Sequence, residues 1–217
     1  GFDELMDKGI PQGTSVIICG GPGSGKTIFC LQTLNTAVMK GEKCIYMTFE
    51  ESPERLKQHM HDFGWHPEKS EKKGNLIIKK YSPFEVTRQV EAMLEQAKGE
   101  LLIDVKPLIF HEKFKPDWIF VDSLSAIASA FIGKEDTYRI YIEQLFRLFE
   151  EIGAAAFLIS ESVDMATKFS ASGVEEFLAD GVVALYNIKH GNVRENAVEI
   201  VKMRGAGFAK KIVAMKI

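Results

Sequence analysis

A glycine-rich segment near the amino terminus carries the residue types that hold a nucleoside triphosphate. From Gly20 to Thr27 it matches the Walker A pattern G-x-x-x-x-G-K-[ST] and lies between an apolar run and an amphipathic stretch. Small residues let backbone N–H groups curl around the β-phosphate, and the positive end of the following helix adds to the attraction. The Lys26 ammonium would reach the β- and γ-phosphates, and the Thr27 hydroxyl would ligate Mg²⁺. The predicted nucleotide-binding residues are Gly21, Pro22, Gly23, Ser24, Gly25, Lys26, Thr27 and Ile28.

Two acidic positions farther along the chain supply the carboxylates that phosphoryl transfer needs. The apolar run 118–121 ends in Asp122, where a carboxylate would hold Mg²⁺, usually through a water molecule. Glu50 and Glu51 follow another apolar run and are candidates for the base that orients water at the γ-phosphate. Because neighbouring strand residues point to opposite faces, geometry favours only one of them. We therefore expect Thr27 and Asp122 at the metal and leave the choice of glutamate open.

Short apolar runs alternate with amphipathic stretches along most of the chain, and these elements must position the site. The expected strands cover residues 15–20, 43–49, 76–80, 118–121 and 154–159. The expected helices cover residues 26–40, 52–63, 83–97 and 137–152. Ser52 and Pro53 have the residue types that open a helix. Strands alternating with helices predict βαβ units, and therefore an α/β fold with a mostly parallel sheet.

The carboxyl-terminal part follows a different pattern. Strands are expected at 181–188, 197–202 and 211–215, and turn signals at 191–192 and 205–207 join them. Short turns between strands are typical of antiparallel pairing. Residues 101–113 stay ambiguous because Pro107 interrupts them.

Composition favours one globular α/β domain over a disordered, membrane-spanning or strongly basic protein. The 217 residues, 46% of them hydrophobic, suffice for a single domain with a substantial core, so we interpret 1–217 as one ATPase domain. Lys and Arg number 27 against 30 Asp and Glu, a net charge of −3 that gives no sign of a basic nucleic-acid partner. No apolar run approaches the roughly 20 residues that cross a bilayer. The three cysteines form no C-x-x-C pair, so we expect buried free thiols at Cys19 and Cys44 and a cytoplasmic protein.

An ordered set of short motifs resembles the KaiC-like family of the RecA ATPase superfamily over nearly the whole chain. The motifs are GFDEL (1–5), TFEESP (48–53), FGW (63–65), VDSLSA (121–126), GVEEFLADG (173–181) and KMRG (202–205). The resemblance implies a RecA-type core with a twisted, helix-flanked sheet and a ring, usually hexameric, with ATP or ADP and Mg²⁺ between subunits. It implies that Glu50 and Glu51 are catalytic alongside Lys26, and that Lys202 and Arg204 reach the γ-phosphate of the neighbouring subunit. Two positions apart on an expected strand, Lys202 and Arg204 would share one face.

Two departures from the family pattern bear on the expected activity. Where clock members of the family carry Thr-x-His after Lys-x-Arg-Gly, this chain has Ala206 and Phe208. At the adjacent Ser-Thr phosphorylation pair of those members, an ungapped alignment places Glu176 and Phe177, which have no hydroxyl. We therefore expect a Mg²⁺-dependent ATPase ring without that autokinase activity, one that couples nucleotide state to assembly or signalling with an unidentified protein partner.

Two other functions stay open at the level of sequence. A DNA-handling ATPase like RadA or DnaB would present DNA-binding loops in the stretch 161–173. That stretch holds Glu161, Asp164 and Lys168 without interleaved aromatic and basic residues, which disfavours DNA. A nucleotide-gated binding module with little turnover is the other alternative, because the Thr-x-His pattern is absent. Histidines such as His59 and His61, two apart on an expected helix, do not share a face, and we interpret all five as surface residues.

Overall fold

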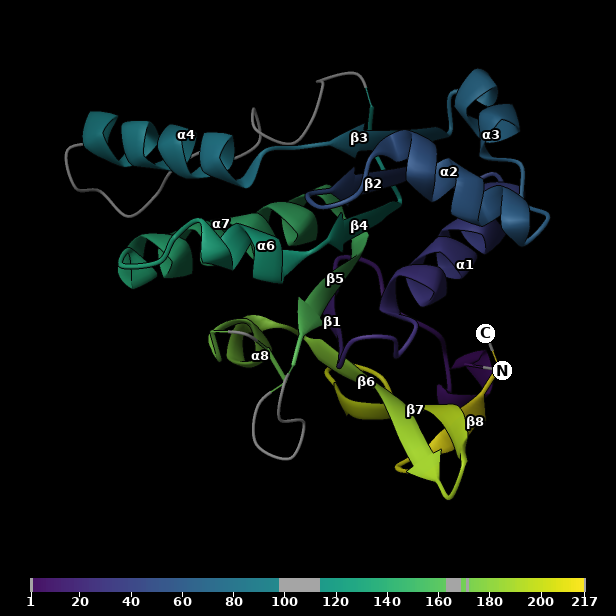
Figure 1. The fold of residues 1–217 in the computed structure, drawn as a ribbon. Coiled ribbons are helices and arrows are strands. Elements are labelled where there is room, and N and C mark those ends of the chain that lie inside the picture. Colours follow the sequence, from purple (N-terminus) through teal and green to yellow (C-terminus); the bar gives the residue numbers. More distant parts are fainter. Residues whose placement is uncertain (1, 98–113, 163–168, 171, 217) are drawn as a thin grey trace.

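The computed structural model of the chain describes residues 2–97, 114–162, 169–170 and 172–216 (Figure 1). In these ranges an eight-stranded sheet has the order β3-β2-β4-β5-β1-β6-β7-β8. The strands are β1 (Ser15–Gly20), β2 (Cys44–Thr48), β3 (Leu76–Lys80), β4 (Trp118–Asp122), β5 (Ala155–Glu161), β6 (Gly181–His190), β7 (Val193–Met203) and β8 (Val213–Met215). The helices are η1 (Phe2–Leu5), α1 (Lys26–Met39), α2 (Pro53–Asp62), α3 (Pro67–Lys73), α4 (Pro83–Gln96), α6 (Leu124–Ser129), α7 (Glu135–Ile152) and α8 (Glu175–Leu178).

The pairing of the strands confirms the predicted α/β class. Every neighbouring pair from β3 to β6 is parallel, whereas β7 runs antiparallel to β6 and β8 antiparallel to β7. All six residues of β1 are buried, as are all five of β2. Helices cover both faces of a parallel sheet, so its central strands can be apolar on both sides.

The two faces of the sheet pack against different helices (Figure 1). In β1, Ile17 and Cys19 belong to the core cluster that includes α7, while Val16 and Ile18 belong to the cluster that includes α1. This division follows from the alternation of side chains along a strand. The amino-terminal residues lie against the carboxyl-terminal ones, because Ala209 N–H donates to the Leu5 carbonyl.

Helix boundaries agree with the expected start and stop signals. Ser52 Oγ accepts a hydrogen bond from Arg55 N–H at the start of α2, with Pro53 as the first helical residue. The turn expected at 191–192 joins β6 to β7, which are longer than predicted. The stretch 101–113 lies outside the described residues.

In the described ranges, the 3-10 helix η1 and three short α-helices were not predicted from the sequence. The seven residues of α3 include a single buried side chain, so they show no apolar period. The six residues of α6 and the four of α8 span fewer than two helical turns. None of the helices in the described ranges is both long enough and apolar enough to span a membrane.

Candidate nucleotide-binding site

The segment between β1 and α1 forms a tight loop in which three positions favour glycine, one because a side chain would clash and two because of the backbone conformation. A Cβ on Gly20 would collide with Ser24 Oγ and with the Leu185 carbonyl oxygen of β6. Gly23 and Gly25 have φ values of 74° and 92°, in the left-handed region. Ser24 is 1% exposed, and its Oγ has no hydrogen-bond partner in the described part of the chain. Such a buried hydroxyl fits a loop built to receive an oxygen-rich ligand.

The amino terminus of α1 has no side-chain cap. The side chains of Ser52, Ser82 and Ser123 cap α2, α4 and α6, whereas Gly25, like the residues before α3 and α7, supplies none. The first backbone N–H groups of a helix need an acceptor, and together with the helix dipole they attract phosphate. Lys26 Nζ adds its charge beside the loop, donating to the carbonyls of Gly20 (2.9 Å) and Gly21 (3.1 Å).

Thr27 and Asp122, both expected from the sequence to hold the metal, lie together at the first turn of α1. The Thr27 hydroxyl donates to Asp122 Oδ2 at 3.0 Å, although 95 residues separate them. Burial raises the pKa of Asp122, and the nearby charges of Glu50 and Glu51 raise it further, while hydrogen bonds from Tyr46 and Thr27 lower it. A divalent cation would relieve this crowding of negative charge, and hydroxyl and carboxylate oxygens are the ligands that Mg²⁺ takes. The residues present therefore fit Mg²⁺.

Tyr46 belongs to this site and was not predicted from the sequence. Its hydroxyl donates to Asp122 Oδ2 at 2.7 Å, and its side chain is fully buried. Burial and the Asp122 carboxylate together raise the pKa of the Tyr46 phenol, so it stays a donor. The only sequence signal is a phenol within the otherwise apolar run of β2. Its partner depends on the pairing of β2 with β4.

Glu50 and Glu51 follow β2 and diverge. Because β2 and β4 are parallel with Thr48 paired to Asp122, their carboxyl ends meet at one edge of the sheet. Glu50 Oε1 accepts a 2.6 Å hydrogen bond from the hydroxyl of Ser123, the residue after Asp122. Glu51 instead lies near α2, where its Oε2 is 3.1 Å from Arg55 Nε and 3.8 Å from His59 Nδ1. Only Glu50 is linked directly to the residue that follows Asp122.

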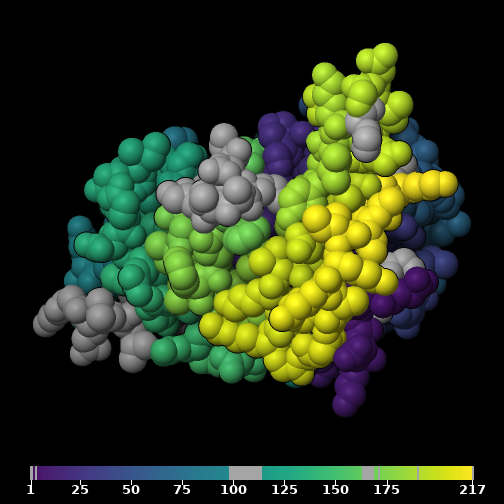
Figure 2. All heavy atoms as spheres, turned by 90° about the horizontal axis from the view of Figure 1, so that it is seen from below, coloured from purple at the N-terminus to yellow at the C-terminus, as the bar shows by residue number. Residues whose placement is uncertain are grey.

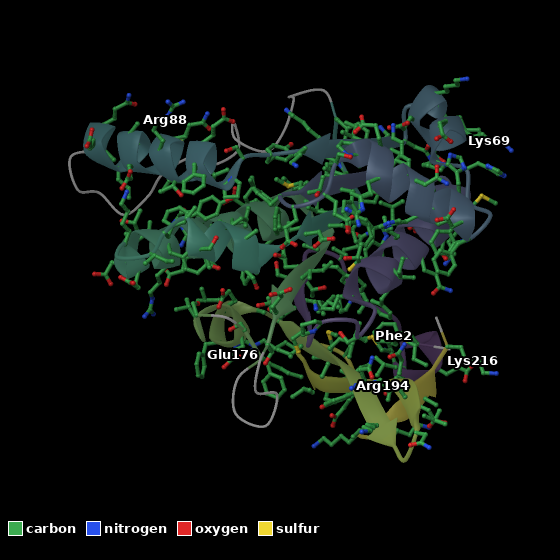
Figure 3. All side chains as sticks on the ribbon, in the orientation of Figure 1. Phe2, Lys69, Arg88, Glu176, Arg194 and Lys216 are labelled. Atoms are coloured by element: carbon green, nitrogen blue, oxygen red, sulfur yellow. The ribbon has the colours of Figure 1, made fainter. Side chains whose placement is uncertain are left out.

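Lys202 and Arg204 contact the segment around α8, which Figure 3 marks with the label of Glu176. Lys202 Nζ donates to the carbonyls of Glu176 (3.2 Å) and Ala179 (2.6 Å). Arg204 Nη2 donates to the Phe177 carbonyl at 3.4 Å. Both side chains therefore reach the same segment, although β7 ends at Met203 and Arg204 lies in the turn that follows rather than on the expected strand face. Burial lowers the pKa of Lys202, and the neighbouring Arg204 charge lowers it further.

These two cations lie at the far edge of the sheet from the phosphate loop of their own chain. Lys202 pairs with Val182 of β6, and Val182 pairs with Ile17 of β1. The loop begins after Gly20, which is 20 − 17 = 3 residues beyond Ile17. At ~3.3 Å per strand residue, that separation is about 10 Å along the sheet. The antiparallel direction of β7 is the cause, because β7 ends where the parallel strands begin.

The remaining predicted features are peripheral to the site. Ala206 and Phe208 are partly buried against the α1-side core. The cysteines at 19, 30 and 44 are free and buried. Of the stretch 161–173, Asp164 and Lys168 lie outside the described residues. No cluster of three or more His, Cys, Asp or Glu able to hold a metal occurs in the ranges that the structure covers.

Comparison with known proteins decides the family. A family model described as "ATPase: KaiC" matches residues 1–217. The chain belongs to the KaiC ATPase family. The motif-based prediction is confirmed, and with it the RecA-type fold with antiparallel carboxyl-terminal strands.

Individual relatives agree with this assignment. The chain is 35% identical over 213 residues to the circadian clock protein KaiC3 of Synechocystis, covering 97% of this chain and 41% of that protein. It is 32% identical over 211 residues to the circadian clock oscillator protein KaiC of Thermostichus vulcanus, covering 97% of this chain and 40% of that protein. It therefore spans about two-fifths of these KaiC relatives. The crystal structure of a KaiC-like protein from Pyrococcus horikoshii superposes with a TM-score of 0.79 at 29% identity, covering 100% of this chain and 91% of that one.

Proposed function

We propose that this KaiC-family chain binds ATP with Mg²⁺ at the loop 20–27 and hydrolyses it to ADP. The observation that carries the proposal is the meeting of Thr27 with Asp122 beside the open end of α1, with Glu50 hydrogen-bonded to Ser123. A phosphate cradle, metal ligands and a carboxylate that can act on water are the parts that phosphoryl transfer to water requires.

Each group has a distinct role in this proposal. The loop N–H groups and Lys26 hold the β- and γ-phosphates, and Thr27 and Asp122 hold the metal. Bound Mg²⁺ supplies charge neutralisation at the phosphate oxygens. Glu50 orients the attacking water and accepts its proton. Glu51, held by Arg55 and His59 on α2, fixes the segment after β2 instead.

The second half of each site comes from another copy of the chain. Lys202 and Arg204 are directed away from their own phosphate loop by the antiparallel β7, so they serve a neighbour's γ-phosphate in a ring, which we propose to be a hexamer. Cations supplied in trans stabilise the charge that develops during phosphoryl transfer. The relatives described as clock proteins support a role in assembly or signalling with a protein partner, and the free cysteines support a cytoplasmic location.

Separate substitution of the two glutamates tests the assignment. Glu50→Gln keeps the shape of the side chain but removes the base, so we expect phosphate release to fall by ~100-fold or more. Glu51→Gln is the matched control and should retain most turnover. Both variants, and the double variant, should bind ATP as the wild type does. Equal turnover in the wild type and the double variant would show that neither glutamate is catalytic, whereas negligible turnover by the wild type itself would favour a binding module.

A further inference from the structure

The strand β6 continues beyond the end of β1 and forms a wall beside the phosphate loop. Gly20 pairs with Leu185, yet β6 runs on to His190 before turning into β7. In the space-filling view, this hairpin projects from the body of the molecule (Figure 2). Residues of β6 after Leu185 therefore lie at the level of the loop.

Asn187 of β6 contacts the loop directly. Its Nδ2 donates to the Gly23 carbonyl at 3.3 Å, across 164 positions of sequence. A Cβ built on Gly23 would lie 3.9 Å from the same nitrogen. Arg194 of β7, labelled in Figure 3, donates from Nη1 to Asn187 Oδ1 at 3.1 Å. Lys189 pairs with Arg194 two positions beyond Asn187, so both contacting side chains share one face of the hairpin.

Building on the proposed ATP binding, we propose that Asn187 is a positioning residue for the phosphate loop and that Arg194 sets the orientation of its amide. The Gly23 carbonyl and the Ser24 N–H belong to one peptide plane and point in opposite directions. Fixing the carbonyl therefore fixes the N–H, which closes the turn onto the Gly21 carbonyl at 3.3 Å. Asn187 thus keeps a partially negative oxygen turned toward β6.

Because glycine is conformationally free, the hydrogen bond from Asn187 is needed to hold the Gly23 carbonyl in place. Gly23, at φ 74°, has no side chain to restrict it, and the neighbouring peptide planes rotate easily. A carbonyl rotated toward the phosphates would repel them. Holding the loop in its binding conformation before the ligand arrives lowers the ordering cost of binding.

Arg194 determines which end of the amide faces the loop. A carboxamide has an accepting oxygen and a donating nitrogen, whereas a guanidinium can only donate. The contact with Arg194 therefore engages the oxygen of Asn187 and leaves the nitrogen for the Gly23 carbonyl. An arginine on β7 is thereby linked to the phosphate loop of β1 through one side chain of β6.

The test is a titration of the purified chain with a fluorescent ATP analogue and Mg²⁺, together with steady-state kinetics. Asn187→Ala removes one hydrogen bond worth ~1 kcal/mol, so we expect binding about fivefold weaker and KM raised equally. Maximal turnover should change less than about twofold, because the loop contacts phosphates in ground and transition states alike. Asn187→Asp should weaken binding more than Asn187→Ala, since its acceptor oxygen faces the Gly23 carbonyl.

Two further comparisons separate positioning from loss of stability. Arg194→Ala should weaken binding and Arg194→Lys should restore it, because an ammonium also donates to the Asn187 oxygen. Tyr186→Phe is the matched control: it removes a 2.6 Å hydrogen bond to Glu199 in the same hairpin, and ATP affinity should not change. Wild-type affinity in Asn187→Ala, or equal loss in Tyr186→Phe, would overturn the positioning role while leaving ATP binding intact. Absence of ATP binding by the wild type would instead overturn both proposals.

Discussion

Replacement of Tyr46 by phenylalanine tests an unpredicted contact at the proposed metal site. Tyr46 is fully buried, and its hydroxyl lies 2.7 Å from Asp122 Oδ2. Phenylalanine keeps the ring and its stacking on Phe120, so the change removes one charge-assisted hydrogen bond and little packing. A hydrogen bond to a charged group contributes ~1.5–3 kcal/mol, so the free energy of unfolding should fall by about 2 kcal/mol at neutral pH.

The loss should depend on pH, with a definite sign. Burial raises the pKa of Asp122 above its unfolded value, while the Tyr46 bond opposes that rise. The folded carboxyl therefore keeps its proton to higher pH, and its ionisation disfavours folding as pH rises through its folded pKa. Without the Tyr46 hydroxyl, the folded pKa of Asp122 rises further. The free energy of unfolding lost in Tyr46→Phe is therefore largest at pH values above the folded pKa of Asp122, and it becomes smaller as the pH falls below that pKa.

Urea unfolding at a series of pH values measures this effect. Tyr141→Phe serves as a control, because Tyr141 is 1% exposed and, among the described residues, its phenol is influenced by burial and Tyr81 rather than by a carboxylate. In an Asp122→Asn background, Tyr46→Phe should cost only ~1 kcal/mol, since the remaining bond is neutral. A loss below ~0.5 kcal/mol at neutral pH, or one that does not vary with pH, would refute the reasoning.

Three further predictions follow from the site and its topology. If Lys202 acts in trans, mixing inactive Lys202→Ala with inactive Glu50→Gln should restore about a quarter of the sites by random assembly, whereas no recovery would contradict shared sites. Gly20→Ala should lower the melting temperature more than Gly21→Ala, because nothing lies within 4 Å of a Cβ at Gly21. Radiolabelled ATP should leave no stable label near Glu176, and a labelled peptide from that segment would contradict the absence of an autokinase.

Local sequence was sufficient for the phosphate loop and for Asp122. The pattern of the loop is visible locally, because Gly23 and Gly25 are required by the conformation of a single turn. Asp122 was found because a buried strand ends there in an acidic residue, as a phosphate-loop site requires. The structure places it in hydrogen-bond contact with Thr27, and the binding of a metal by the two residues stays a prediction.

Whether a helix could be predicted from the sequence depended on how regularly its apolar residues are spaced. In α7, the apolar side chains of Leu145, Leu148 and Phe149 are buried, and those of Ile140 and Ile152 are partly buried. Buried side chains at helical spacing make such an element visible in the sequence. In α3, by contrast, the segment PEKSEKK is almost wholly polar, and only Pro67 and the left-handed Gly74 mark its ends. A short helix without regularly spaced apolar residues cannot be predicted from the hydrophobic pattern of the sequence.

Local residue patterns were enough to predict the family, the strand–loop–helix that we propose holds phosphate, and the acidic and basic residues of the site. Which of these residues meet depends on the fold. It separated Glu50 from Glu51, joined Tyr46 to Asp122, brought Asn187 to Gly23, and carried Lys202 and Arg204 to the opposite edge of the sheet. The physical reason is that such contacts depend on strand order, direction and register. Those are set by packing between segments far apart in the chain, and no local pattern of residues encodes them.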